Sequence, residues 1–363
     1  MIPQREYFDK DIANSDNTSG YYIIEENDFV YNPRKSADAP YGPISSYKYA
    51  EAGIVSPLYL CFRAKKKINP AFFEWYFRSS AWHRYVYMSG DSGARHDRVS
   101  IKDDTFFAMP INIPAAQEQE HIASFLDRID QRIEMQRALV DNLKKYKRGL
   151  SSLLFDEIAK GKCQTILFAN AFRLLQNNTF SRDDLSFEDG DVRNIHYGDV
   201  LIKYGTSVDI GNSSIPCIKP DRNIEKFSAS SYLQNGDIVF ADTAEDYAVG
   251  KATEIIGVSF HKVLSGLHTI PCRPHDTFAP MYLGYYFNSH HFRSQIFRMI
   301  QGIKVSSISK SEIVKTCILV PSYEDQTRIA SALNKVDSLI EREEATVLAL
   351  QKIRRGLLQH LFI

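Results

Sequence analysis

The 363-residue sequence lacks long apolar runs, and no signal peptide or membrane-spanning segment is recognisable in it. Cysteine is scarce as well. The five cysteines are too far apart to form a CxxC zinc pair or an even disulfide framework, at Cys61, Cys163, Cys217, Cys272 and Cys317. We therefore expect a cytoplasmic protein that lies in a reducing compartment and does not contact a membrane.

Neither sign of charge is in excess, because 44 Lys and Arg residues balance 44 Asp and Glu residues. A protein that binds nucleic acid through a wholly basic surface is thereby excluded, and any basic face must be local. Hydrophobic residues make up 44% of the chain. At this length, that composition predicts two or more globular domains.

The common catalytic motifs are missing. We find no glycine-rich phosphate loop, no Gly-x-Ser-x-Gly elbow and no His-Glu-x-x-His, and Asn32-Pro33 lacks the following proline and aromatic residue that amino-methylating enzymes use. The histidine pair His290-His291 lies on an expected amphipathic helix, where such residues more often pack or face solvent than bind metal. We therefore identify no candidate catalytic residue and no metal site, and we expect no cofactor.

One stretch occurs twice, as residues 114–155 and again as residues 321–362, aligned without a gap at an offset of 207 (321 less 114). In both copies the apolar residues alternate steps of four and three, which predicts a coiled-coil helix. These residues are Ile122, Leu126, Ile129, Ile133, Val140, Leu143, Leu150 and Leu154 in the first copy, and Ile329, Leu333, Val336, Ile340, Val347, Leu350, Leu357 and Leu361 in the second.

Polar residues interrupt both patterns at equivalent positions, first Gln136 and Glu343, then Lys147 and Arg354. If the helices pair antiparallel about their midpoints, Gln136 and Glu343 lie close together and fix the register. Acids fill the first half of each copy and bases the second, so antiparallel pairing sets opposite charges against each other. The helix dipole is an alternative cause of that distribution. We predict an intramolecular antiparallel coiled coil that acts as a spacer.

Two α+β globular units precede the helices. We expect a β-rich run at 106–113, a strand hairpin at 196–205, and one aromatic amphipathic helix in each unit, at 71–88 and 281–300. The predicted fold therefore has a first unit at 1–113, a central helix at 114–155, a second unit at 165–319 and a C-terminal helix at 321–363. The units are distant relatives, since EENDFVYNP resembles QNGDIVFAD and WYFRSSAWHRYVY resembles YYFNSHHFRSQIF.

The first unit has only one turn-strand signal, Asn27-Asp28, whereas the second has two, Gly198-Asp199 and Gly236-Asp237. We expect the first unit to lack an opening half-domain. Its sheet would then have an unpaired edge, and an apolar patch would be exposed at Val30, Leu58, Leu60 and Phe62.

Basic and polar residues occupy equivalent loops of both units, where phosphate contacts and base-edge reading would need them. Each of these residues taken alone is more often an ordinary solvated loop residue. The candidates are Arg34, Lys35, Tyr41, Arg95 and Arg98 in the first unit, and Lys203, Tyr204, Thr243, Lys251, Arg298, Lys304 and Ser306 in the second, which we expect to line one DNA-facing surface.

Together these features resemble the specificity (S) subunit of type I restriction-modification systems. The resemblance rests on two variable units, each followed by a helix that closes with R-G-L-x-x-x-L-F, and on Pro321, Gln326, Ile329, Ala330, Asp337, Ile340, Gly356, Leu357 and Phe362. It implies a non-catalytic subunit in which each globular unit is a target recognition domain for half of a bipartite double-stranded DNA site.

The resemblance also implies partners. Two modification (methyltransferase) subunits would dock on the helical parts, for which we expect Gln119, Arg128, Gln326 and Arg328 to be available, and restriction subunits would join through the complex. Three alternatives remain: a structural or regulatory coiled-coil protein that does not read DNA, a truncated, recombining specificity cassette, and a self-contained enzyme such as a nuclease.

Overall fold

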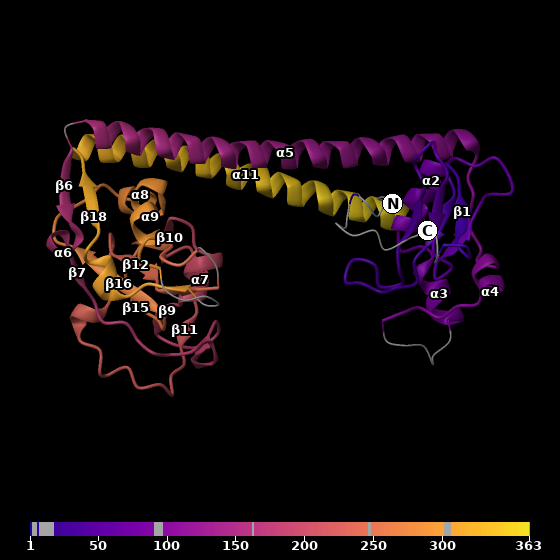
Figure 1. The fold of residues 1–363 in the computed structure, drawn as a ribbon. Coiled ribbons are helices and arrows are strands. Elements are labelled where there is room, and N and C mark those ends of the chain that lie inside the picture. The colour runs from indigo at the N-terminus through magenta and orange to yellow at the C-terminus, as the bar shows by residue number, and fades with distance from the viewer. Residues whose placement is uncertain are drawn as a thin grey trace. The chain divides into compact units, whose positions relative to one another are not determined.

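The computed structural model describes Met1, Glu6 and residues 18–90, 97–161, 163–245, 248–300 and 306–362 (Figure 1). The chain divides into two compact units, the first made of Met1–Leu139 with Glu343–Ile363 and the second of Val140–Arg342. The long helices α5 (Ala116–Lys160) and α11 (Tyr323–Leu361) therefore contribute to both units. In the described ranges, no helix is long and apolar enough to cross a membrane.

The first unit is built on a three-stranded antiparallel sheet of order β3-β2-β5, beside a two-stranded pair β1-β4. Phe29 and Tyr31 of the central strand point into an aromatic core, in which Tyr31 stacks on Phe106 at 5.1 Å. Leu126 of α5 and Phe362 belong to the same core. The elements are β1 (Tyr22–Ile24), β2 (Phe29–Tyr31), β3 (Ile44–Ser46), β4 (Gly53–Val55), β5 (Leu60–Phe62), α2 (Pro70–Arg78), α3 (His83–Ser89) and α4 (Asp103–Phe107).

The second unit contains a five-stranded sheet of order β10-β14-β12-β16-β7 and a four-stranded sheet of order β15-β9-β11-β8. Its strands are β6 (Gln164–Leu167), β7 (Phe172–Leu174), β8 (Leu185–Ser186), β9 (Val192–Ile195), β10 (Ser207–Asp209), β11 (Cys217–Ile218), β12 (Ile238–Ala241), β13 (Thr243–Ala244), β14 (Ala252–Ile256), β15 (Lys262–Ser265), β16 (Thr269–Pro274), β17 (Ser306–Ser307) and β18 (Cys317–Val320). Its shorter helices are α6 (Phe168–Ala171), α7 (Tyr197–Ile202), α8 (Tyr282–Asn288), α9 (His290–Phe297) and α10 (Lys310–Ile313), with 3-10 turns at Arg182–Asp184 and Ala229–Ser231.

Two local predictions are wrong. Residues 196–205, expected to form a strand hairpin, contain helix α7, because His196 caps its start by accepting a hydrogen bond from the Gly198 amide at 3.1 Å. The segment 106–113, expected to be β-rich, contains the end of α4 and no strand. The aromatic helix expected in each unit is present but is divided in two, at Ser79 in the first unit and Ser289 in the second.

Both units share one scaffold around their central strand. The turn before it has a left-handed residue, Asn27 (φ +70°) or Gly236 (φ +86°). The next residue is a buried aspartate held by an arginine through two short contacts, Asp28 with Arg63 at 2.6 and 2.7 Å and Asp237 with Arg273 at 2.7 and 2.6 Å. The Arg63 bond lowers the pKa of Asp28, whereas deeper burial raises the pKa of Asp237.

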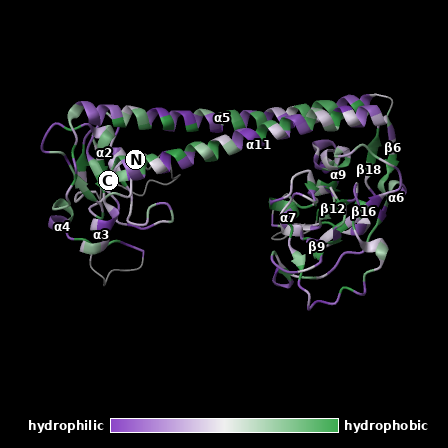
Figure 2. Cartoon of the chain, turned by 180° about the vertical axis from the view of Figure 1, so that it is seen from behind, coloured by the Kyte–Doolittle hydropathy of each residue, from purple (hydrophilic) through white to green (hydrophobic). Residues whose placement is uncertain are grey.

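The helices pair antiparallel, as predicted. In the first unit, Gln136 of α5 donates to Glu343 of α11 at 2.5 Å. Arg354 bonds Asp130 in the same unit, and the equivalent residues of the second unit, Lys147 and Asp337, make an ion pair at 2.5 Å. The basic second half of each helix thus meets the acidic first half of the other. Hydrophilic and hydrophobic residues alternate along both helices (Figure 2).

The second unit has strands for which the described part of the first unit shows no counterpart. Strands β14 and β16, which flank β12, are themselves bordered by β10 and β7, whereas β3 and β5 are edges. The exposed apolar patch expected there is largely absent. Val30 is buried between β3 and β5, Leu60 and Phe62 pack partly against the aromatic core, and only Leu58 is well exposed.

Candidate nucleic-acid interface

The same pair of loops meets at the end of the central strand in both units. In the second unit, β13 pairs with β17, and the Ile308 amide donates to the Asp242 carbonyl at 2.9 Å. In the first unit, the Val99 amide donates to the Pro33 carbonyl at 2.8 Å. These bonds are equivalent in sequence, since both residues shift by 209 (242 less 33, and 308 less 99). The scaffold therefore presents one loop pair twice.

The first loop pair brings together three predicted residues. Arg34 and Arg98 form an isolated antiparallel bridge, and the Lys35 amide donates to the Asp97 carbonyl at 2.9 Å. The side chains of Arg34, Lys35 and Arg98 are exposed, so they form a local basic patch. Tyr41 is half-buried and its ring lies 4.7 Å from that of His83. The predicted residue Arg95 lies outside the described residues.

The second loop pair brings together Thr243 and Ser306, which lie on the paired strands β13 and β17. Both side chains are partly exposed. Arg298 is exposed at the C-terminal end of α9, and Lys304 lies outside the described residues. This loop pair therefore offers hydroxyl groups where the first offers guanidinium groups.

Two residues expected on the second surface point inward. Tyr204 is 4% exposed and belongs to a core with Val208 and Val239, so it lines no surface; burial raises its pKa above the ordinary value. Lys251 is partly buried and donates to the Leu201 carbonyl at 2.8 Å, at the C-terminal end of α7. Burial lowers the pKa of Lys251.

Lys203 is exposed, but it is already engaged. Its ammonium group donates to the Ser214 carbonyl and lies 5.3 Å from the ring centre of Phe187. Since α7 replaces the expected strand, the residues after it do not extend from a strand end. Tyr204 instead packs back against the sheet.

Sequence reasoning missed a polar cluster beside Thr243. The turn between β15 and β16 places His268 with its Nδ1 atom 3.3 Å from the Asp242 carboxylate, and Thr243 donates to the same carboxylate at 2.7 Å. Tyr197 at the start of α7 packs edge-to-face on the His268 ring at 5.3 Å. The available signal was the Ser-Gly-Leu-His segment between two apolar runs, which is typical of a tight turn.

Two residues expected to bind partner subunits are buried instead. Gln119 and Gln326 are 7% and 3% exposed. The Gln326 amide donates to the Pro321 carbonyl at 3.0 Å and accepts from the Ala279 amide at 2.9 Å, and Gln119 makes the same pair of bonds with Pro114 and Asn69. These glutamines join each helix to its own globular part, so they are not available for docking.

The other two, Arg128 and Arg328, are exposed, and Arg328 makes an ion pair with Asp325 at 3.1 Å.

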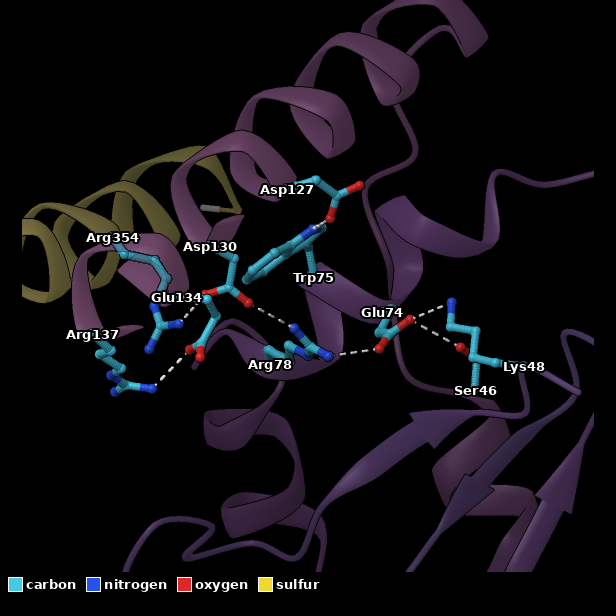
Figure 3. Close-up of polar contacts among 10 residues, drawn as sticks. All are labelled: Ser46, Lys48, Glu74, Trp75, Arg78, Asp127, Asp130, Glu134, Arg137 and Arg354. Carbon is cyan, nitrogen blue, oxygen red and sulfur yellow. Dashed lines mark hydrogen bonds and ion pairs between the residues drawn. The ribbon is translucent and has the colours of Figure 1, made fainter. Parts of the chain in front are cut away.

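A second junction fixes α2 of the first unit against α5 (Figure 3). Trp75 donates to Asp127 at 2.8 Å, and Arg78 lies 2.7 Å from Glu74 and 3.6 Å from Asp130. These residues line a hollow of about 720 Å³. Its carboxylates are already paired with cations or with the indole, which indicates a structural junction. Across the described ranges, no group of three or more His, Cys, Asp or Glu residues has the arrangement of a metal site.

Comparison with known proteins supports a nucleic-acid interface. Residues 10–145 match a family model described as the type I restriction modification DNA specificity domain. Over this stretch the chain therefore resembles a type I DNA specificity domain.

Two solved structures are similar to this chain in fold. One is a chain from a study of complex assembly and conformational transition in the type I R-M system, with a TM-score of 0.61 and 16% identity over 93% of this chain and 81% of that chain. The other is the HsdS subunit from Thermoanaerobacter tengcongensis, with a TM-score of 0.51 and 16% identity over 94% of this chain and 81% of that one. Both cover the two globular parts and the long helices.

Proposed function

We propose that this chain is a type I specificity subunit and that each of its units reads one half of a bipartite DNA site through its loop pair. The observation that carries this proposal is the repeated bond between the loops, Val99 to Pro33 and Ile308 to Asp242, at the end of each central strand. The fold keeps this presentation constant while its side chains differ. Arg34 is paired with Arg98 in one unit, and Thr243 is paired with Ser307, next to Ser306, in the other. A backbone arrangement that stays the same while the loop side chains differ is suited to reading two different half-sites.

The two loop pairs suit different contacts. Arg34 and Arg98 can contact phosphates or donate two hydrogen bonds to a guanine edge, whereas Thr243 and Ser306 suit short contacts to a base or a phosphate. Because the chain as a whole has a net charge of zero, the electrostatic attraction for the duplex has to come from local basic residues such as these arginines. We further propose that the exposed surfaces of α5 and α11, including Arg128 and Arg328, dock two modification subunits, and that restriction subunits join through the complex.

The test uses the full chain assembled with its modification subunits and a pool of randomised duplexes. Replacing Arg34 and Arg98 by Ala should change one half-site only. Selection at that half-site should relax by about tenfold or more if a base is read, or the salt dependence should become shallower if phosphates are contacted.

The matched control replaces Lys65 and Lys66, which are exposed and follow the end of β5 at Phe62. The strand register places this end of β5 beside Phe29, at the start of β2, away from the loop pair that follows Tyr31. This variant should select the unchanged bipartite site. If the Arg34 and Arg98 variant binds and selects as the wild type does, the first loop pair does not contact DNA. If the wild-type chain selects no sequence at all, the alternative of a coiled-coil protein that does not read DNA is favoured.

A further inference from the structure

We propose that His268 determines specificity in the second unit by contacting a base edge beside Asp242 and Thr243. This inference deepens the proposed function and rests on it. It assigns a base-reading role to the turn between β15 and β16, which lies next to the loop pair. Three observations carry the inference: the backbone of the turn, the polar partners of the imidazole, and the sign of the neighbouring charge.

The turn holds His268 in a conformation that few side chains adopt. Its φ angle is +53°, in the left-handed region. Buried Ser265 and Thr269 bond each other at 2.7 Å across the turn, and Thr269 also donates to the Gly266 carbonyl at 2.5 Å. The Asp242 amide donates to the His268 carbonyl at 3.1 Å. The surrounding bonds therefore fix this backbone, as is typical of functional positions with uncommon backbone angles.

The imidazole is presented to solvent but is not free to rotate. Its side chain is 47% exposed, and one face is limited by the ring of Tyr197 at 5.3 Å. The Nδ1 atom lies 3.3 Å from Asp242 and 3.5 Å from the Thr243 hydroxyl. Because these contacts engage Nδ1, Nε2 is left to make an outward hydrogen bond. A preorganised ring of this kind loses little entropy on binding.

The charge beside His268 favours a base over a phosphate. Asp242 carries a carboxylate next to the ring, and a carboxylate facing the phosphate backbone would be repelled by it. Against a base edge, the same group can accept a hydrogen bond from the cytosine amino group. Asp242, His268 and Thr243 together offer donors and acceptors at the end of β12, so the cluster fits a groove that displays both.

The experiment compares full-length wild type with His268→Ala and His268→Gly, using the randomised duplex pool and then the selected duplex with single base-pair changes. We expect both variants to lose about tenfold or more of the discrimination at one base pair of one half-site. The other half-site and the salt dependence of binding should stay within about twofold of the wild type. Glycine adopts positive φ without strain. The His268→Gly variant therefore keeps the turn and removes only the ring.

His275 provides a control matched in residue type. It is exposed just after β16, whereas His268 lies just before the strand, so the two histidines flank opposite ends of one strand. His275→Ala should select the wild-type site. Unchanged discrimination at every base pair in both His268 variants would overturn the inference, as would a full wild-type preference in His268→Gly with loss only in His268→Ala. Failure of the wild type to select any site would instead count against the proposed function.

Discussion

At the scale of single residues, Glu254 shows how burial changes a titration. This residue of β14 is 2% exposed, and its carboxylate accepts bonds from the amides of Met281 at 2.7 Å and Gly284 at 2.9 Å. Burial outweighs these bonds and raises the pKa of Glu254 from 4.5 to about 7. The folded unit therefore holds a proton that the unfolded chain releases at lower pH.

This shift predicts a pH dependence with a definite sign. A raised folded pKa contributes stability below about pH 4.5, and that contribution is lost as the pH rises to about 7. Urea unfolding of the wild type and Glu254→Gln across this range should show a smaller fall in unfolding free energy for the variant. Glu188→Gln, at an exposed glutamate of the same unit, should follow the wild type. Parallel curves for the wild type and Glu254→Gln would contradict the assignment.

Lys203 and Tyr204 show a second effect at this scale. The two residues are adjacent in sequence, yet one is exposed and the other is 4% exposed within a core. The two side chains differ in exposure because helix α7 ends at Ile202. Just after this end, Lys203 stays at the surface and Tyr204 packs against the sheet. Polar or aromatic character alone therefore does not locate a DNA-facing residue in a loop.

At the scale of elements, the helix pair is organised by polar residues inside an apolar seam. Gln136 is 4% exposed and bonds Glu343, while Leu126 and Ile133 in the same unit are fully buried. A shift of α11 along α5 would place these polar groups against apolar side chains. A buried polar pair of this kind fixes register at some expense of stability.

A double-mutant cycle tests this pairing. Gln136→Leu and Glu343→Leu should each destabilise the protein, and the double variant should recover part of the loss, with a coupling energy of about 1–2 kcal/mol in thermal or urea unfolding. The matched control is the exposed pair of Glu134 and Arg137, 2.8 Å apart on the surface of α5. Its coupling should be about 0.5 kcal/mol or less. Additive effects at Gln136 and Glu343 would show that their contact does not set the register.

At the scale of the whole molecule, duplication explains most of the architecture, and the units differ in how completely their sheets are covered. Strands β14 and β16 have outer neighbours, whereas β3 and β5 are edges in the described part of the chain. Unpaired sheet edges favour local opening.

We therefore predict that limited proteolysis with a protease of broad specificity cuts within residues 1–110 well before it cuts within 165–319. Mass spectrometry of timed samples identifies the first cuts. The second unit is the internal control, because it belongs to the same chain and is digested under the same conditions. A specific duplex should protect both loop pairs if both read DNA. Equal resistance of the two units without DNA would contradict the difference in stability.

The sequence by itself determined the features that repeat with a fixed period. The offset of 207 and the alternating steps of four and three predicted two long helices, and the interruptions at Gln136, Glu343, Lys147 and Arg354 predicted their antiparallel register. Helix periodicity is a local property, and the two repeated helices pair with each other, so both features can be inferred from the amino-acid sequence alone.

Only the tertiary structure decided which of the candidate residues face outward. Tyr204, Gln119 and Gln326 became buried because the sheet or a neighbouring helix covers them, and His268 came to lie beside Asp242 because β12 and β16 pair in register. These outcomes depend on contacts between residues far apart in sequence. Composition and spacing do not specify such contacts, since the same polar residue is stable in solvent or in the interior when a partner satisfies its hydrogen bonds.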